Sequence, residues 1–220
     1  MVVTKYSWGS HSLKSEDKVE KNRCWACYHS DLYSFDIDGR MVGIIPCAVG
    51  APYAVLVAEQ LFVSGCEILV SVTSAGIINP PAINKRFALI TEAVRDEGTS
   101  YHYLPDNVPS LVSHDLFERL KSDSEDMESL WFEAKSWTTD APYRETETAI
   151  MAMKKDNVTC VEMEAAALYA FAKTKNKNVV CFAHLTNTMA QQEGDFEKGE
   201  SFGSVAMLDL IVEVLKKLEQ

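Results

Sequence analysis

Short apolar runs alternate with amphipathic segments along most of this chain. A short continuous apolar run predicts a buried strand, whereas apolar positions spaced three or four residues apart predict a helix. The predicted strands are 32–37, 41–47, 68–72, 86–91, 133–138 and 179–185. The predicted helices are 52–64, 110–121, 146–155, 162–175 and 204–218. Residues 1–30 show no clear periodicity, so we expect an irregular N-terminal segment.

The order of these elements predicts the fold class. Asp38-Gly39 is typical of a tight hairpin turn between the first two strands. From Met41 to Gly76 the pattern reads as strand, glycine-containing turn, helix and strand, which predicts a parallel βαβ unit with a right-handed crossover. The continued alternation predicts a three-layer α/β/α fold with a twisted central sheet, mostly parallel or mixed. We expect one domain over residues 1–220.

Three small or polar segments follow predicted strands or strand-like runs. They are Val49–Pro52, Thr73–Gly76 and Thr186–Thr188, and we expect each to be a turn. Ligands of α/β folds bind outside the carboxyl ends of the strands, where these segments should meet. The amides of Gly50 and of the turn up to Gly76, with the hydroxyls of Thr73 and Ser74, could hold an oxyanion. The alternative is that these are ordinary turns without a ligand.

Two carboxylates mark the start of the alanine-rich segment 161–168, with the sequence Val-Glu-Met-Glu-Ala-Ala-Ala-Leu. On the predicted helix Glu162 and Glu164 point to roughly opposite sides, so at least one should face inward. A buried carboxylate is costly unless it is paired, which favours a binding site for a polar ligand. Glu162 could support such a site from behind, and an exposed position for it is equally compatible with the sequence.

Charge and cysteine content narrow the classes of partner. The formal net charge is −11 and the sequence pI is near 4.9, so we expect no nucleic-acid partner and no anionic membrane surface. No apolar run reaches the length of a membrane span and no signal-peptide pattern opens the chain. The use of the six cysteines is that of a cytoplasmic protein rather than of a disulfide framework. Cys24 and Cys27 form a C-x-x-C pair without a second pair, so we expect no metal site there, a metal assisted by His11 or His29 being the alternative.

Taken together, these segments resemble the nucleoside phosphorylase superfamily, which comprises purine nucleoside phosphorylases, uridine phosphorylases and methylthioadenosine/S-adenosylhomocysteine nucleosidases. The resemblance runs from about Met41 to Leu218. Its most specific piece is 161–168, which is similar to the ribose-binding motif of that family. The resemblance implies that Met163 packs on the sugar and that Glu164 accepts hydrogen bonds from its hydroxyls. It also implies a phosphorylase-like fold and a small-molecule nucleoside as the substrate.

Three further pieces carry the resemblance. The segment 71–76 is similar to the phosphate-site turn of the family, which implies roles for Thr73, Ser74 and Gly76. The segment 136–144 lies where the family builds its base-binding wall, and its Tyr143 and Arg144 are implied substrate contacts. Asn187 stands where purine-acting members carry the aspartate that protonates the base, so it is the implied partner of the leaving base.

The chain also departs from the family pattern. Ser71 stands where phosphorolytic members usually have a phosphate-binding arginine, and Asn187 can donate a hydrogen bond but not a proton. We expect an enzyme that cleaves an N-glycosidic bond by phosphorolysis, with phosphate as co-substrate and no cofactor. Hydrolysis of the same bond and non-catalytic nucleoside binding or storage remain the alternatives.

A loop rich in aromatic residues, 96–105, contains His102. This histidine could reach a ligand or a subunit contact, and simple packing is the alternative. Members of the family are usually oligomeric with sites near subunit contacts, so the resemblance implies a homo-oligomer.

Overall fold

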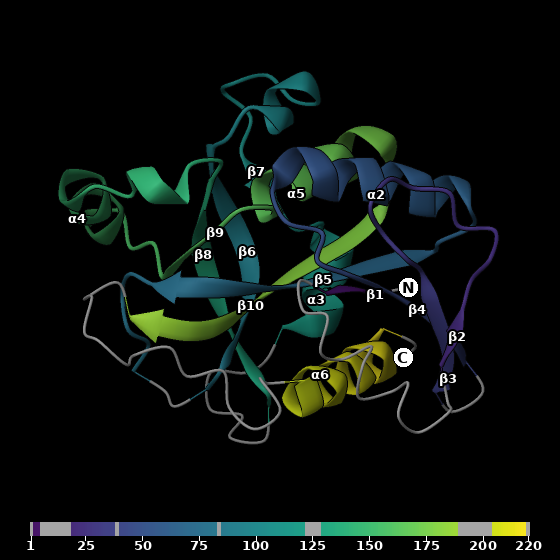
Figure 1. The fold of residues 1–220 in the computed structure, drawn as a ribbon. Coiled ribbons are helices and arrows are strands. Elements are labelled where there is room, and N and C mark those ends of the chain that lie inside the picture. The colour runs from purple at the N-terminus through teal and green to yellow at the C-terminus, as the bar shows by residue number, and fades with distance from the viewer. Residues whose placement is uncertain are drawn as a thin grey trace.

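The described residues of the computed structural model form one ten-stranded sheet flanked by helices (Figure 1). The structure describes residues 2–4, 19–37, 40–82, 85–121, 129–188 and 204–218. The strands are β1 (Val2–Thr4), β2 (Glu20–Lys21), β3 (Tyr33–Ile37), β4 (Arg40–Pro46), β5 (Ile68–Ile77), β6 (Phe87–Asp96), β7 (Ser110–Leu111), β8 (Trp131–Thr139), β9 (Cys160–Glu162) and β10 (Asn178–Thr188). The α-helices are α2 (Ala51–Val63), α3 (His114–Leu120), α4 (Glu147–Lys155), α5 (Ala165–Lys175) and α6 (Ser204–Lys217). Two short 3-10 helices are η1 (Thr99–His102) and η2 (Pro142–Arg144).

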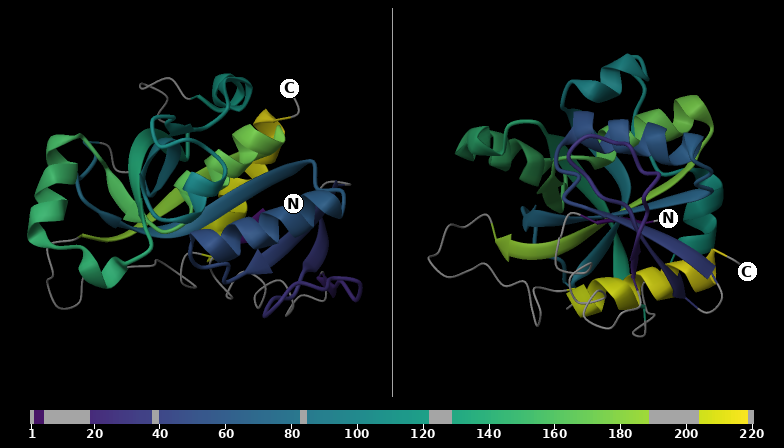
Figure 2. Two further views of the ribbon diagram at one scale, coloured as in Figure 1. Left: turned by 90° about the horizontal axis from the view of Figure 1, so that it is seen from above. Right: turned by 45° about the vertical axis from the view of Figure 1, so that its right-hand side comes forward.

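Part of the sheet closes on itself. The strand order is β10-β6-β8-β9-β5-β1-β4-β3-β2, and β10 also pairs with β5. The strands β5, β10, β6, β8 and β9 therefore form a closed ring, from which β1, β4, β3 and β2 extend as an open sheet. The ring mixes parallel pairs (β5–β10, β6–β8, β8–β9) with antiparallel ones (β6–β10, β5–β9). Figure 2 shows the strong twist that this closure requires.

Helices cover both faces of the sheet, as predicted. Helices α2 and α5 share an apolar cluster with the sheet that includes Leu61 and Phe171. A second cluster holds α3 and α6 against the opposite face through residues such as Leu116 and Ile211. Figure 1 shows α2 and α5 above the sheet and α6 below it. The three-layer α/β/α fold class is thus confirmed.

Several local predictions were wrong because pairing between distant segments overrides local sequence preference. The strands β4 and β5 are parallel but not adjacent, since β1 from the expected irregular N-terminal segment lies between them. The expected turn 73–76 is part of β5, which continues to Ile77 and pairs there with β9 and β10. The expected turn 186–188 is likewise the end of β10. The expected helix 110–121 is a short strand followed by α3, whose first turn is capped by Ser113.

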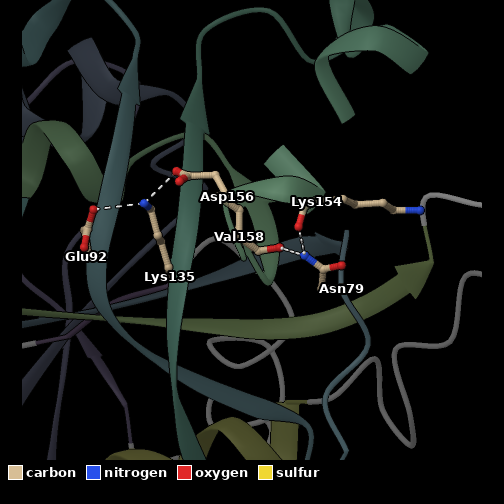
Figure 3. Close-up of polar contacts among 6 residues, drawn as sticks. All are labelled: Asn79, Glu92, Lys135, Lys154, Asp156 and Val158. Carbon is tan, nitrogen blue, oxygen red and sulfur yellow. Dashed lines mark hydrogen bonds and ion pairs between the residues drawn. The ribbon is translucent and has the colours of Figure 1, made fainter. Parts of the chain in front are cut away.

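The segment between β8 and β9, which contains η2 and α4, is attached to the sheet by polar contacts (Figure 3). The Lys135 ammonium pairs with Asp156, at 2.7 Å, and with Glu92, at 3.1 Å. The Asn79 side-chain amide donates to the carbonyl oxygens of Lys154 and Val158, at 3.2 and 2.7 Å. These contacts fix the end of α4 and the entrance to β9, and therefore the point from which the motif 161–168 begins.

Two findings concern the cysteines and the helices. Each of the six cysteines is a free thiol. Among the residues that the structure describes, none of the helices combines the length and apolar character that crossing a bilayer requires.

Candidate functional site

Glu164 lies where three distant segments meet. It precedes the first residue of α5, and its side chain is 2% exposed. One carboxylate oxygen accepts a hydrogen bond from the backbone N–H of Gly50, and the other accepts one from the Thr73 hydroxyl, both at 2.7 Å. A carboxylate offers about four lone-pair positions, so it can hold protein donors and ligand hydroxyls together. The structure therefore brings together three of the residues that the sequence singled out.

The contribution of Gly50 depends on its backbone conformation. Its φ of 88° lies in the left-handed region, which a glycine adopts without steric cost. In this conformation Gly50 caps α2 and directs its own N–H at Glu164. The carboxylate thus lies at the N-terminus of α2, where the helix dipole favours a negative charge.

Glu162 is buried, with 3% of its surface exposed, and it lies outside α5. The prediction that both carboxylates sit on one helix was wrong, because the chain is still in strand β9 at Glu162 and α5 begins only at Ala165. One oxygen of Glu162 accepts from the hydroxyls of Ser136, at 3.1 Å, and Thr138. The other accepts from the backbone N–H groups of Glu164 and Ala165, at 2.7 and 2.8 Å.

Although Glu162 accepts hydrogen bonds from four donors, its surroundings favour the protonated form of its carboxyl group. Burial, and secondly the neighbouring charge of Glu164, raise the pKa of Glu162 to about 7 despite the hydrogen bonds from Thr138 and the two amides. The same burial, with Glu162 as a second cause, raises the pKa of the Cys160 and Cys181 thiols, so both stay protonated. Because only 3% of its surface is exposed, the alternative of an exposed Glu162 is excluded.

Sequence reasoning missed the roles of Ser136 and Thr138. It treated the segment from Ser136 onward as a wall for the base, whereas these two hydroxyls face Glu162 from β8. Alternation along a strand places residues two apart on one face, so the pattern Ser-Trp-Thr at 136–138 already indicated a pair of hydroxyls facing the same way. What the pattern lacked was the partner, because β9 was not predicted.

The other predicted site residues lie in several different elements of the fold. Met163 is half-buried, as are Ser74 and Gly76 in β5. The backbone of Asn187 pairs with Gly76, and its side chain lies outside the described residues. Tyr143, 83% exposed, and Arg144 project from η2.

His102 lines a different feature, a groove of about 520 Å³ over the outer side of α2. This groove is bounded by the segment 26–28, by α2 and by η1. His102 therefore faces this groove, together with Thr99 and Tyr103. Over the described ranges, no three or more His, Cys, Asp and Glu side chains gather in an arrangement that could hold a metal ion.

The fold and the buried carboxylates define a class of protein, and comparison with known proteins identifies it. The family model described as Phosphorylase superfamily matches residues 13–214, so the chain belongs to that superfamily. Its curated relatives include a guanosine phosphorylase of Halorubrum lacusprofundi, 26% identical over 138 residues, which are 63% of this chain and 57% of the relative. A purine nucleoside phosphorylase of Plasmodium vivax is 23% identical over 153 residues, 68% of this chain and 62% of the relative. The chain therefore matches less than two thirds of the length of either relative.

Solved structures share the fold over the full chain. A uridine phosphorylase from Vibrio fischeri has a TM-score of 0.79 at 18% identity and covers 100% of this chain and 90% of its own. A purine nucleoside phosphorylase from Toxoplasma gondii, in complex with immucillin-H, has a TM-score of 0.81 at 13% identity, with coverages of 100% and 91%. At these identities the likeness concerns the fold.

Proposed function

We propose that this chain is a single-domain nucleoside phosphorylase that cleaves the N-glycosidic bond of a nucleoside with phosphate. The observation that carries the proposal is the buried Glu164 carboxylate, held by Gly50 and Thr73 at the convergence of β5, α2 and α5. Membership of the superfamily, and relatives named guanosine, purine nucleoside and uridine phosphorylase, support the same reaction class.

The chemistry divides among the site residues. Glu164 accepts hydrogen bonds from the ribose hydroxyls, and its charge stabilises the cationic sugar that forms as the bond to the base breaks. Met163 packs on the sugar, and Glu162 supports the sugar site from behind. A phosphate oxygen attacks the anomeric carbon while the bonding electron pair leaves with the base, and Asn187 donates a hydrogen bond to that base. Phosphate is co-substrate and no cofactor takes part.

The remaining predicted residues serve the two ends of the substrate. In this proposal the phosphate lies beside Thr73, Ser74 and Gly76. Tyr143 and Arg144 contact the base from η2.

Hydrolysis is the second candidate, and Ser71 favours it. This serine is buried in β5, two residues before Thr73 and on the same face of the strand. A neutral side chain at this position supplies no charge for a phosphate dianion, whereas water needs none.

The test is a nucleoside panel with and without phosphate. The purified protein is incubated with guanosine, inosine, adenosine and uridine, and the free base and sugar product are separated by chromatography. We expect base release that requires phosphate and yields a sugar phosphate. Release of free ribose without phosphate would replace the proposal by hydrolysis, and no release from any nucleoside would leave only binding or storage.

We also infer a cytoplasmic homo-oligomer in which a second copy covers the groove over α2. Exposed apolar side chains border it, namely Tyr28, Leu56 and Val63, and contiguous apolar surface of this kind marks an interface. A two-fold arrangement would bury the same side chains from both copies.

Val63→Asp tests this interface, because a charge in a buried apolar contact opposes association. We expect light scattering after gel filtration to give the 24.5 kDa mass of one chain for this variant and a multiple of it for the natural protein. Met151→Asp, at an exposed apolar position of α4, is the matched control and should leave the mass unchanged. A natural protein that runs as a single chain would disprove the assembly.

A further inference from the structure

We propose that Glu162 is a positioning residue, which fixes the Glu164 carboxylate by holding the first turn of α5 against β8. The inference rests on the proposed role of Glu164 in binding the sugar. It assigns to Glu162 a role through the protein and not through contact with the substrate.

The hydrogen bonds of this turn form an unbroken chain. The N–H groups of Glu164 and Ala165 donate to Glu162, and the N–H of Ala166 donates to the Thr138 hydroxyl, at 2.9 Å. That hydroxyl in turn donates to Glu162. Three successive amides, which an α-helix leaves without intrahelical partners, are thus anchored to two side chains. The backbone that carries Glu164 is therefore fixed before any ligand arrives.

Both oxygens of Glu162 are occupied by protein donors, which argues against a direct role in the sugar site. One oxygen faces two hydroxyls and the other faces two amides. A carboxylate is suited to this position because it accepts at both ends. An amide accepts at one end only, so Gln at this position turns an N–H₂ group toward either the amides or the hydroxyls.

The burial of the Glu162 carboxylate is unfavourable in free energy, so its presence points to a role other than stabilising the fold. Burial, and secondly repulsion by the charge of Glu164, raise the pKa of Glu162, so a charge at this position costs free energy. A neutral side chain at position 162 would relieve this repulsion. The four hydrogen bonds of the Glu162 carboxyl group place Glu164 accurately, and a misplacement of about 1 Å can cost about 10²-fold in rate.

The amide of Gly50 offers a readout that needs no substrate. It donates to Glu164 from another part of the chain, so its hydrogen exchange reports whether that carboxylate stays in place. We expect Glu162→Gln to speed exchange at Gly50 by about tenfold or more, because the amide loses a hydrogen bond to a charged group, which is stronger than one between neutral groups. Glu164→Ala, which removes the acceptor, gives the upper limit of this effect.

The matched control is Glu97→Gln. Glu97 is also a buried carboxylate, 5% exposed, and it accepts from two backbone amides at the start of a helix, those of Thr99 and Ser100. This variant should alter exchange in η1 while leaving Gly50 unchanged.

The experiment measures amide exchange by NMR together with KM and kcat for guanosine and uridine. Faster exchange at Gly50 in Glu162→Gln, with a KM raised about tenfold, supports the positioning role. Faster exchange only at Glu164 and Ala165, with Gly50 unchanged, overturns it and leaves a helix cap. If Glu164→Ala alters exchange at Gly50 but not nucleoside turnover, the proposed function of the site fails, while the exchange data still decide the role of Glu162.

Discussion

Glu164→Gln is expected to lower kcat/KM for the nucleoside by about 10²–10³-fold, the loss found when a preorganised electrostatic contact to a transition state is removed. Glutamine keeps the shape of the side chain and can still accept from Gly50 while its N–H₂ group faces the Thr73 hydroxyl. The negative charge that stabilises the cationic sugar is lost, and one oxygen becomes a donor. Calorimetric titration with guanosine measures the loss of binding. Steady-state kinetics on the substrate found in the panel measure the loss of kcat/KM.

The geometry predicts a small change in fold stability for this variant, because Gly50 and Thr73 each retain a hydrogen-bond partner at position 164. Thermal unfolding of Glu164→Gln should therefore stay within a few degrees of the natural protein, a shift of about 1 kcal/mol at most. Glu97→Gln again provides the control, with normal kinetics. Unchanged kcat/KM in Glu164→Gln would mean that this carboxylate is structural and that the sugar binds elsewhere.

Tyr169→Phe is expected to destabilise the fold by about 2–4 kcal/mol, because it leaves two buried backbone groups without a partner. The strands β6 and β10 pair from Phe182 with Leu89 to His184 with Phe87, so Cys181 and Ile90 would form the next pair. There the Tyr169 hydroxyl stands between the strands instead. It donates to the carbonyl oxygen of Ile90 and accepts from the N–H of Cys181, at 3.0 Å.

Denaturant unfolding at equilibrium tests this prediction. Burial raises the pKa of the Tyr169 hydroxyl well above its usual value, so it remains a donor throughout the accessible pH range. Tyr101→Phe is the control, since the Tyr101 hydroxyl also donates to a backbone carbonyl, that of Arg95, at 3.0 Å, but at the surface, where water can replace it. Equal stability losses in the two variants would contradict the view that the Tyr169 hydroxyl satisfies two buried backbone groups between β6 and β10.

The sequence by itself determined the elements whose apolar pattern is long and regular. The strands β3 and β4, the helix α2 and the helix α6 agree with their predicted ranges to within a few residues, while the predicted turn Asp38-Gly39 lies outside the described residues. Periodicity of this kind reports which face of an element is buried, so it also predicted helices on both faces of a sheet. Glu164 was singled out from the motif 161–168 through its resemblance to the ribose-binding motif of the family.

The tertiary structure decided what depends on pairing between distant segments. The segment 73–76 has the small and polar residues of a turn, yet it continues as β5 because β9 and β10 supply its hydrogen bonds. The strand β1, only three residues long, has too little sequence to show a period, and its place between β4 and β5 follows from the partners on either side. Local composition cannot reveal such partners.

Dependence on distant partners also explains why the sequence was informative about Glu164 but not about Glu162. Glu164 could be singled out by its neighbours in the sequence, but Gly50 and Thr73, which hold it, are 114 and 91 positions away. Glu162 remained undecided between surface and interior until Ser136, Thr138 and the first turn of α5 were seen to surround it. A sequence specifies which groups are available for hydrogen bonds, whereas the closure of the sheet decides which of them meet, because burial makes each polar group find a partner or lose stability.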